Sequence, residues 1–531
     1  MPEDYDLKHD LTHDFTDDLT YDFAIIGSGP SGSVLAHYLT KAGARCVMLE
    51  AGKGLNKQTY PSNELHANSQ LMWNGGMDTS KDAQLLFLRG KVLGGGSVVN
   101  QCLLDRFDAL ALNDWRAQSN VSWHELTEFE RHYDEVESHF ALHHFTSNEH
   151  QTNAKLFMQG LDKCGMQWSP LRRGQSQCGL NHDTGQANDC MQCLGGCVRD
   201  SKQSMPVTFL KKARAQGLNV LTDFHVAQVI HGQHFVSIYG HQLGQVRNIR
   251  ARHCILAAGA IGTTELLLKS GFLPALPALG QGFTCHPQRM NIGLFDEVVD
   301  AHKGTFQSVK SDDPSFREQG FKLENVFAGP IAISMLKPGF GREHQDFVQQ
   351  YRHMACIEVA VRDATAGQIL LNNQGKLVID KRLNQADLKR IQAGLNAVDR
   401  VFDAVKAKSV LKSPFSIGLH LMGGCTMGDT PRSSVVNSDF GVWKHNRLSI
   451  ADSSIFPNAP GINPSLTIMA MAHKASESLL AQYASPHVYY QHKPTKSLLA
   501  DASLVQKGAP LSEGLSKGLL SKEGNNETAT G

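Results

Sequence analysis

The side chain best suited to acid–base chemistry near neutral pH lies late in the chain, in the segment LHLMGGCTMG at residues 419–428. His420 stands there just before two glycines. An imidazole has an ordinary pKa of about 6.5, so it can accept a proton from a reacting group at neutral pH. A single histidine among apolar neighbours is also a common packing residue, and the rest of the chain must decide between the two roles.

Asn463, in the segment GINPSLTIMAMA, is a second polar candidate. Pro464 is suited to the first position of a helix, which makes Asn463 the residue that caps this helix. A capping role alone would explain the asparagine. The same position also faces whatever lies beyond the helix N-terminus, where the helix dipole favours negative charge and the amide can bind a substrate oxygen.

A glycine motif near the start of the chain has the spacing of a dinucleotide-binding turn. The segment GSGPSG places Gly27, Gly29 and Gly32 in the pattern G-x-G-x-x-G, between a buried strand at 21–26 and a helix at 31–42. The first glycine permits a tight turn, the second lets the backbone approach a pyrophosphate, and the third lets the helix pack on the strand. The fingerprint predicts a dinucleotide site but does not choose between NAD and FAD.

Two further segments can complete this site. Glu50 ends a second apolar strand at 44–50, where its carboxylate can bind ribose hydroxyls, although a solvated acid would also suit a strand end. In RGKVLGGGSVVNQ, residues 89–101, consecutive glycines allow a flat ligand or a phosphate to approach the backbone closely. Asn100 could instead form a turn. The candidate residues of these segments are Glu50, Gly94, Gly95, Gly96, Ser97 and Asn100.

Four of the 11 cysteines crowd one segment, with the spacing C-x2-C-x3-C at its end. Thiolates at such spacing can hold zinc or an iron–sulfur cluster, and a cluster would carry single electrons. Plain thiols are the alternative, and a thioredoxin-type pair is disfavoured because the strand-to-helix setting is missing. The four candidates are Cys178, Cys190, Cys193 and Cys197.

Length and charge narrow the class of protein. A chain of 531 residues is long enough for two or more domains. Its formal net charge is zero, which gives no reason to expect nucleic acid or an anionic membrane as a partner. The acidic start has no leader pattern, and no run reaches the roughly 18 apolar residues of a spanning helix, so we expect a cytoplasmic protein. The polar ends at 1–20 and 485–531 are predicted to be disordered tails.

The remaining patterns indicate an α/β fold. A buried strand, a glycine turn and a helix are predicted over 252–271, a hairpin over 367–380, and a long amphipathic helix over 384–407. We therefore expect a Rossmann-like doubly wound domain with a parallel sheet, interleaved with a second, sheet-bearing domain.

Several of these segments together resemble the glucose-methanol-choline (GMC) flavoprotein oxidoreductases. The resemblance spans about residues 21–482, with the motifs in the family's order. It is carried by YDFAIIGSGPSGSVLAHYLTKAGARCVMLEAG, RGKVLGGGSVVN, CILAAGAIGTTELLLKSG, GQGFTCHP, HLMGGCTMG and LSIADSSIFPNAPGINPSLTIMAMA. It implies an FAD-binding domain at 21–290 and 410–484, with insertions near 105–175, and a substrate-binding domain at 291–409.

By this resemblance the dinucleotide is FAD, and residues 94–100 lie along its pyrophosphate and isoalloxazine. The strand around Val226 resembles the one that meets the adenine. Asp452 matches a family aspartate near the flavin phosphates and ribityl chain, although it could equally cap a local turn. Some members attach FAD through a histidine just before Asn100, and because Val99 stands there we expect noncovalent FAD.

The resemblance also assigns the catalytic pair. His420 matches the active-site histidine that accepts the hydroxyl proton, and Asn463 its polar partner. We expect Cys425 to be a small buried filler, His286 to be structural, and His473 to be a surface or packing residue.

The resemblance predicts oxidation of a small-molecule alcohol, with electrons passed to oxygen, a quinone or a protein carrier. The closest motifs belong to the cholesterol oxidase and long-chain fatty alcohol oxidase branches. With the apolar segment at 324–340, they favour a hydrophobic alcohol or a sterol. A sugar or choline-type dehydrogenase and a non-catalytic flavin-bound binding protein are the alternatives.

Overall fold

The structure is a computed structural model that describes residues 21–176, 178, 192–305 and 307–484. Its elements up to Leu480 form one compact unit. The segments 1–20 and 485–531, for which we predict disorder, lie outside the described residues. The domain boundaries at 291 and 409 stay predictions.

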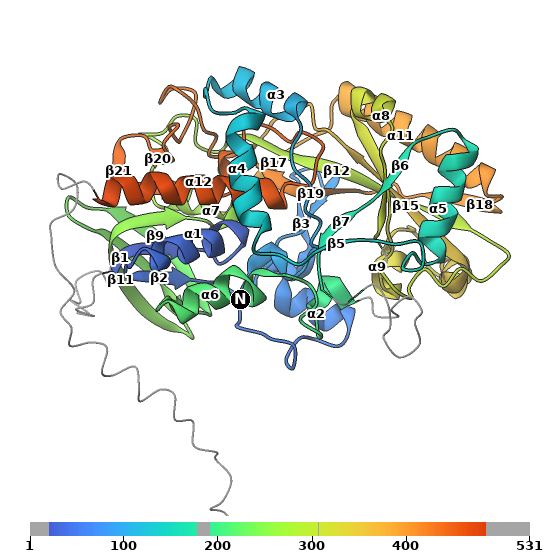
Figure 1. The fold of residues 1–531 in the computed structure, drawn as a ribbon, viewed down its shortest axis with the longest axis horizontal. Helices are drawn as coiled ribbons and strands as arrows, with labels where there is room; N and C mark the ends of the chain where they lie inside the picture. Colours follow the sequence, from blue (N-terminus) through green and yellow to red (C-terminus); the bar gives the residue numbers. More distant parts are fainter. Residues whose placement is uncertain (1–20, 177, 179–191, 306, 485–531) are drawn as a thin grey trace, which may run out of the picture. The chain divides into compact units, whose positions relative to one another are not determined.

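The first sheet is built on the predicted strand, helix and strand at the start of the described chain (Figure 1). β1 (Tyr21–Ile26) pairs in parallel with β2 (Cys46–Leu49) on one side and with β11 (Gln245–Leu256) on the other. α1 (Pro30–Lys41) connects β1 to β2. Residues 23–26 are almost fully buried, as expected for a parallel strand that is covered on both faces.

The sheet continues outward from these three strands. In parallel register, β21 (His445–Ile450) pairs with β11, and β8 (Asn219–Leu221) pairs with β2. An antiparallel extension consists of β9 (Phe224–His231) and β10 (Val236–Gln242), and β20 (Gly441–Val442) lies at the edge beside β21. The predicted Rossmann-like architecture is confirmed.

The second sheet is organised around one long strand, β12 (Gln281–Leu294). It pairs antiparallel with β15 (Met354–Val361), β16 (Gly367–Leu371), β18 (Ser409–Lys412) and β19 (Ser416–Met422). Strands from distant parts of the sequence therefore pair with the same strand. The predicted second, sheet-bearing part of the fold is confirmed.

Two helices cover one face of this sheet, α5 (Thr152–Lys163) and α11 (Gln385–Ala404). Their approach is close, since a Cβ at Gly394 of α11 would lie 2.3 Å from Val359 of β15. Because side chains alternate along a strand, Glu358 of β15 points to the opposite face.

Other local predictions are also confirmed. β16 forms a hairpin with β17 (Leu377–Asp380), and α7 (Gly259–Lys269) follows β11. Helix α11 begins with a capping box, in which the side chains of Asn384 and Asp387 bind each other's backbone N–H groups.

The last helix departs by one residue from its expected start. α12 (Ser465–Ala484) begins after Pro464, whose carbonyl accepts the first helical hydrogen bond from the Ile468 amide. Pro464 thus takes the capping position that we predict for Asn463. The amide of Asn463 is engaged elsewhere, by Asp105 and Lys322.

The other elements of the described chain are short. The strands are β3 (Asp78–Thr79), β4 (Leu85–Phe87), β5 (Leu142–His144), β6 (Trp168–Pro170), β7 (Arg172–Gly174), β13 (Val309–Ser311) and β14 (Phe321–Asn325). The helices are α2 (Glu64–Leu71), α3 (Ala109–Ser119), α4 (Leu126–Glu137), α6 (Phe209–Ala215), α8 (Pro314–Gln319), α9 (Pro330–Met335) and α10 (Arg342–Gln349). Within the described residues, no helix combines the length and the apolar character needed to cross a membrane.

Buried histidines make the fold sensitive to acid. Burial lowers the pKa of His124, His132, His253 and His420 to about 3 each. In the unfolded chain these groups titrate near 6.5, so below that pH the unfolded state binds protons that the folded state does not. We predict that the urea concentration at the midpoint of unfolding decreases as the pH is lowered from about 7.5 to about 5. A midpoint that stays constant over this range would contradict the prediction.

Candidate active site

A cavity of about 1830 Å³ lies where the glycine-rich segments of the first sheet meet the second sheet. Its walls include both predicted catalytic side chains and most of the predicted cofactor residues. Those that line it are His420, Asn463, Gly27, Gly29, Glu50, Gly95, Gly96, Asn100, Val226 and Asp452. Gly32, Gly94 and Ser97 lie behind this wall, where they hold its backbone in place.

The glycines divide into those that packing requires and those that it does not. Gly27 has a φ of +102°, and a Cβ at Gly32 would lie 2.1 Å from the Gly27 carbonyl oxygen, so neither position accepts a side chain. Gly29 has an ordinary φ of −63°, and a Cβ there would meet nothing within 4 Å. A Cβ at Gly96 would likewise point into open space. These two glycines leave room for a ligand in the cavity.

The two glycine-rich segments touch each other. A Cβ at Gly95 would lie 2.9 Å from the Gly29 Cα atom. The Ser28 hydroxyl connects them, since it accepts a hydrogen bond from the Gly94 amide at 2.8 Å and donates to the Glu50 carboxylate at 2.6 Å. Burial raises the pKa of Glu50, while donors from Ser28 and Gly52 oppose that rise. Glu50 therefore organises the turn as well as facing the cavity.

Asp452 and Asn100 also make local bonds at the wall. Asp452 accepts hydrogen bonds from the Gly259 amide at 2.8 Å, the Thr263 hydroxyl and the Ser454 amide, and so holds the start of α7. The Asn100 side chain accepts from the Cys102 amide at 3.0 Å, as in an Asx turn. Both local roles that we weighed for these residues are present, and both side chains still line the cavity.

His420 forms a pair with the buried histidine His286. Its Nδ1 lies 2.8 Å from Nδ1 of His286, and the Gly461 amide donates to Nε2 of His286 at 2.8 Å. Burial, followed by the charge of Lys322, lowers the pKa of His420 to about 3, so the ring is neutral at physiological pH. From the sequence we predict only a structural role for His286, and its contact with His420 adds a role in orienting that ring.

Asn463 is held at both ends of its amide. Its Oδ1 accepts a hydrogen bond from Lys322 Nζ at 3.1 Å, and its Nδ2 donates to Asp105 at 3.1 Å. Although burial opposes the charged form, Lys310 and Lys322 lower the pKa of Asp105. The amide is thus fixed in one orientation, with one N–H left for a ligand.

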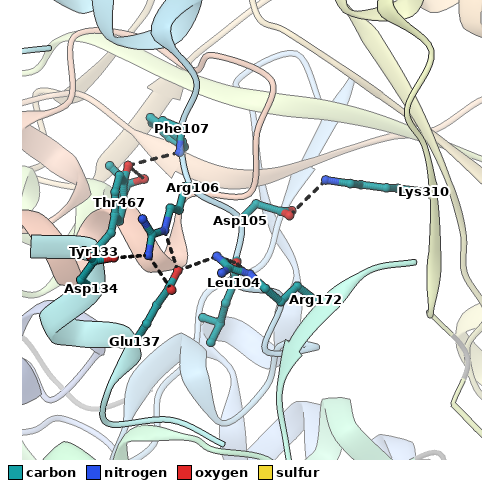
Figure 2. Close-up of polar contacts among 10 residues, drawn as sticks. All are labelled: Leu104, Asp105, Arg106, Phe107, Tyr133, Asp134, Glu137, Arg172, Lys310 and Thr467. Atoms are coloured by element: carbon teal, nitrogen blue, oxygen red, sulfur yellow. Dashed lines mark hydrogen bonds and ion pairs between the residues drawn. The ribbon is translucent and has the colours of Figure 1, made fainter. Parts of the chain in front are cut away.

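The backbone that presents Asp105 is itself anchored, as Figure 2 shows. Arg106 binds Glu137 and Asp134 of α4, and Arg172 binds Glu137 and the Leu104 carbonyl. The hydroxyl of Tyr133 accepts a hydrogen bond from the Phe107 amide and contacts the Thr467 hydroxyl of α12 at 2.8 Å. The segment 104–107 is therefore tied to α4, β7 and α12, and Asp105 reaches Lys310 and Asn463 from a rigid support.

The wall formed by the second sheet carries polar groups that the sequence did not reveal. Glu324 of β14 lies directly opposite Glu358 of β15, and both line the cavity. Glu324 accepts hydrogen bonds of 2.6 Å from Lys322 and from Gln307. The sequence can indicate that side chains alternate between the two faces of each strand, but it does not predict the register that places Glu324 opposite Glu358.

A second part of the wall is apolar. Residues 326–336, including α9, supply it with aliphatic, aromatic and methionine side chains. Glu64 of α2 holds this helix, since its carboxylate accepts a hydrogen bond from the Ile331 amide at 2.9 Å. The apolar segment that we singled out in the sequence thus faces the cavity over much of its length.

The predicted cysteine cluster is only partly described. Cys190 lies outside the described residues, and Cys178 and Cys193 lie on either side of that gap. Cys193 Sγ accepts a hydrogen bond from Arg173, and Cys197 Sγ accepts one from the Lys202 amide. Among the described residues, the three potential metal ligands that come together are not cysteines. They are His132, His473 and Glu477.

Two further histidine and cysteine predictions concern packing. His473 is buried on α12, with its Nδ1 3.0 Å from that of His132. Glu477, the third member of that group, is bound through both oxygens by Arg131, which satisfies its charge without a metal. Cys425 is fully buried beside Thr264. Both residues occupy packed positions away from the cavity wall.

Comparison with known families identifies the class of protein. Two family models described as GMC oxidoreductase match residues 68–288 and 363–472, and a Rossmann-like NAD(P)-binding model matches residues 25–74. The chain belongs to the GMC oxidoreductase family, a family of FAD-dependent oxidoreductases. The resemblance seen in the sequence is confirmed, and the glycine cradle at Gly29 and Gly96 fits such a dinucleotide.

Individual relatives are distant. A long-chain-alcohol oxidase of Arabidopsis thaliana is 24% identical over 86% of this chain and 67% of its own length. A cholesterol oxidase of Acinetobacter baumannii is 23% identical over 87% of this chain and 95% of its own. The solved structure of a pyridoxine 4-oxidase from Mesorbium loti superposes with a TM-score of 0.66 at 15% identity, covering 87% of this chain and 99% of that one. The last match supports the fold.

The open glycines give a direct test of the cofactor cradle. We predict that Gly29→Ala leaves the stability of the flavin-free protein unchanged and lowers flavin occupancy at least about tenfold, because the new methyl group occupies ligand space. Flavin released on heat denaturation, per mole of protein, measures the occupancy. Gly32→Ala is the comparison variant and should lower the unfolding midpoint itself. Full flavin content in Gly29→Ala would contradict the assignment.

Proposed function

We propose that the protein oxidises a hydrophobic alcohol or a sterol at its CH–OH group to the aldehyde or ketone. The single observation that carries this proposal is that the His420 and Asn463 pair shares one cavity with the glycine cradle and the apolar wall at 326–336. When bound, FAD accepts the hydride of such a reaction. The chain's own residues must then bind the alcohol, orient it and take its hydroxyl proton.

His420 is the proposed base. It lines the cavity, and among the described residues nothing hydrogen-bonds its Nε2, so that nitrogen is available to a substrate hydroxyl. The base needs the tautomer that donates its Nδ1–H to His286. In that tautomer Nε2 of His286 carries the proton and can donate it to the Ala459 carbonyl, which also hydrogen-bonds this ring. A hydrogen bond from the Gly461 amide to the same nitrogen requires the other tautomer, in which His286 donates to Nδ1 of His420 and the proton of His420 is on Nε2. The proposed base therefore needs the Ala459 bond in place of the Gly461 bond.

Asn463 is the proposed partner on the substrate oxygen. Lys322 occupies its carbonyl oxygen and Asp105 one of its N–H bonds, so the free N–H can donate to the alcohol. A fixed donor costs no reorganisation when charge develops on that oxygen.

The cofactor is proposed to be noncovalent, because the aliphatic Val99 lines the cavity before Asn100 and offers no nucleophile. Oxygen, a quinone or a protein carrier is the proposed electron acceptor, and the cytoplasm the proposed location. An iron–sulfur cluster at Cys178, Cys190, Cys193 and Cys197 stays a prediction, since Cys190 lies outside the described residues.

The base is tested by single substitutions. We predict that His420→Ala keeps its flavin and slows flavin reduction by the substrate about 10²- to 10⁴-fold, the usual contribution of a positioned base. Stopped-flow absorbance without oxygen measures this rate. His473→Gln, a histidine away from the cavity, is the matched control and should retain the normal rate. Normal flavin reduction in His420→Ala would exclude His420 as the base.

The substrate class is tested with the purified protein under nitrogen. Its visible spectrum is recorded during additions of a long-chain alcohol, a sterol, choline and glucose. We expect the flavin band to bleach with the long-chain alcohol or the sterol, and absorption beyond that of flavin before the additions would indicate an iron–sulfur cluster. Bleaching by choline or glucose alone would overturn the substrate class, and bleaching by none would count against alcohol oxidation.

A further inference from the structure

The acid pair on the second sheet, Glu324 and Glu358, has no role in the reaction proposed above. Glu324 and Glu358 are directly opposed in the antiparallel register of β14 and β15, where Cβ atoms lie about 5 Å apart. The two residues are 1% and 3% exposed. Two ionised carboxylates at such a distance in a buried site repel each other strongly.

The two acids have different partners. Glu324 forms an ion pair with Lys322 and also accepts a hydrogen bond from Gln307, so both of its oxygens are engaged. Glu358 lines the cavity, and no described side chain or backbone group hydrogen-bonds its carboxyl. Because Glu324 holds the nearby cation, Glu358 is the member that carries a proton.

The surroundings of Glu358 support this assignment. The charged groups that face it are Glu324 and Lys322 of β14, while Met290 lies opposite on β12. The helices α5 and α11 cover the other face of the sheet. Burial, and then the charge of Glu324, raise the pKa of Glu358 to about 8, against the effect of Lys322. A neutral carboxylic acid therefore faces the cavity at physiological pH.

We propose that Glu358 is a specificity-determining residue that donates a hydrogen bond to a second oxygen of the alcohol substrate. This inference rests on the proposed function. Lys322 connects the acid pair to the candidate catalytic groups, since its Nζ binds both Glu324 Oε1 and Asn463 Oδ1. The second oxygen thus lies on the same side of the cavity as Asn463, within a few carbons of the reacting hydroxyl, and the apolar body of the substrate lies against residues 326–336.

An oxygen fits Glu358 better than a cationic group does. A cation would have to displace the proton of Glu358, and it would lie close to the positive charge of Lys322, which forms an ion pair with the neighbouring Glu324. An O–H donor needs only an acceptor, which a hydroxyl, ether or carbonyl oxygen supplies. The proposed substrate class is therefore an amphipathic alcohol with a second oxygen, not a simple alkanol.

The first test reads the proton of Glu358 directly. Infrared difference spectra of the holoprotein between about pH 7 and pH 9 should show the carbonyl stretch of a protonated acid that disappears as the pH rises. Glu358→Gln should lack this band, and Glu149→Gln, which removes a buried carboxylate outside the cavity, should keep it. Addition of a diol should shift the band, because the acid then donates to the new oxygen. An absent band, or one that no diol shifts, would overturn the proposal.

The second test compares a dodecanol with dodecanediols that carry the second hydroxyl at successive carbons. The wild-type protein should favour one diol over the dodecanol about tenfold in kcat/KM for flavin reduction, the worth of one buried hydrogen bond. Glu358→Gln should keep this preference, since its amide also donates, and Glu358→Leu should lose it. A preference that persists in Glu358→Leu, or one that Glu358→Gln abolishes as well, would overturn the proposal.

The two tests separate this inference from the proposed function. If no alcohol reduces the flavin, the proposed function fails, and the infrared band and its shift with diols still decide whether Glu358 is a neutral donor. If the dodecanol and every diol react equally well, alcohol oxidation stands and the role of Glu358 is wrong. Flavin content of each variant checks that it has folded.

Discussion

Side-chain alternation along β14 and β15 decides which chemistry this protein presents to its cavity. Val359 of β15 packs against α11, whereas its neighbour Glu358 lines the cavity. A slip of one residue in the pairing would bury the acids among the helices and turn the core outward. The apolar packing of α5 and α11 therefore holds the polar wall in place, because it makes every other register unfavourable.

The same constraint explains what the sequence could and could not predict. The first strand, helix and strand, the hairpin β16–β17 and helix α11 depend on local patterns and turn residues, and these predictions are confirmed. His420 and Asn463 were identified by family motifs, and the structure places both in one cavity. The partners of these two residues were not foreseen. His286 lies 134 residues from His420, and Asp105 lies 358 residues from Asn463.

The glycines show where sequence reasoning succeeds and where it stops. The pattern G-x-G-x-x-G already assigns Gly27 to a turn, Gly29 to the approach of a pyrophosphate and Gly32 to helix packing. In the structure, Gly27 and Gly32 are required by close backbone contacts, whereas Gly29 has an ordinary backbone and empty space where a side chain would go. Outside that pattern, only the surrounding atoms distinguish a glycine that the fold needs from one that a ligand needs. The same reasoning separates Gly94, where an added Cβ would clash with Pro206, from Gly96, where an added Cβ would have nothing within 4 Å.

Lys322 connects the candidate catalytic groups to the acid pair electrostatically. Although burial opposes its charge, Glu324 and Asp105 raise its pKa, so the ammonium is retained. Its charge lowers the pKa of His420 and, through Asn463 Oδ1, turns the amide so that an N–H faces Asp105. It also forms an ion pair with Glu324 and none with Glu358, which makes Glu358 the acid proposed to carry a proton. Burial keeps the histidine neutral and, with the charge of Glu324, favours a proton on Glu358, while Lys322 adds to the first effect and orients the amide of Asn463. The wall formed by the second sheet therefore carries hydrogen-bond donors, and the proposed base keeps an Nε2 that no described residue hydrogen-bonds.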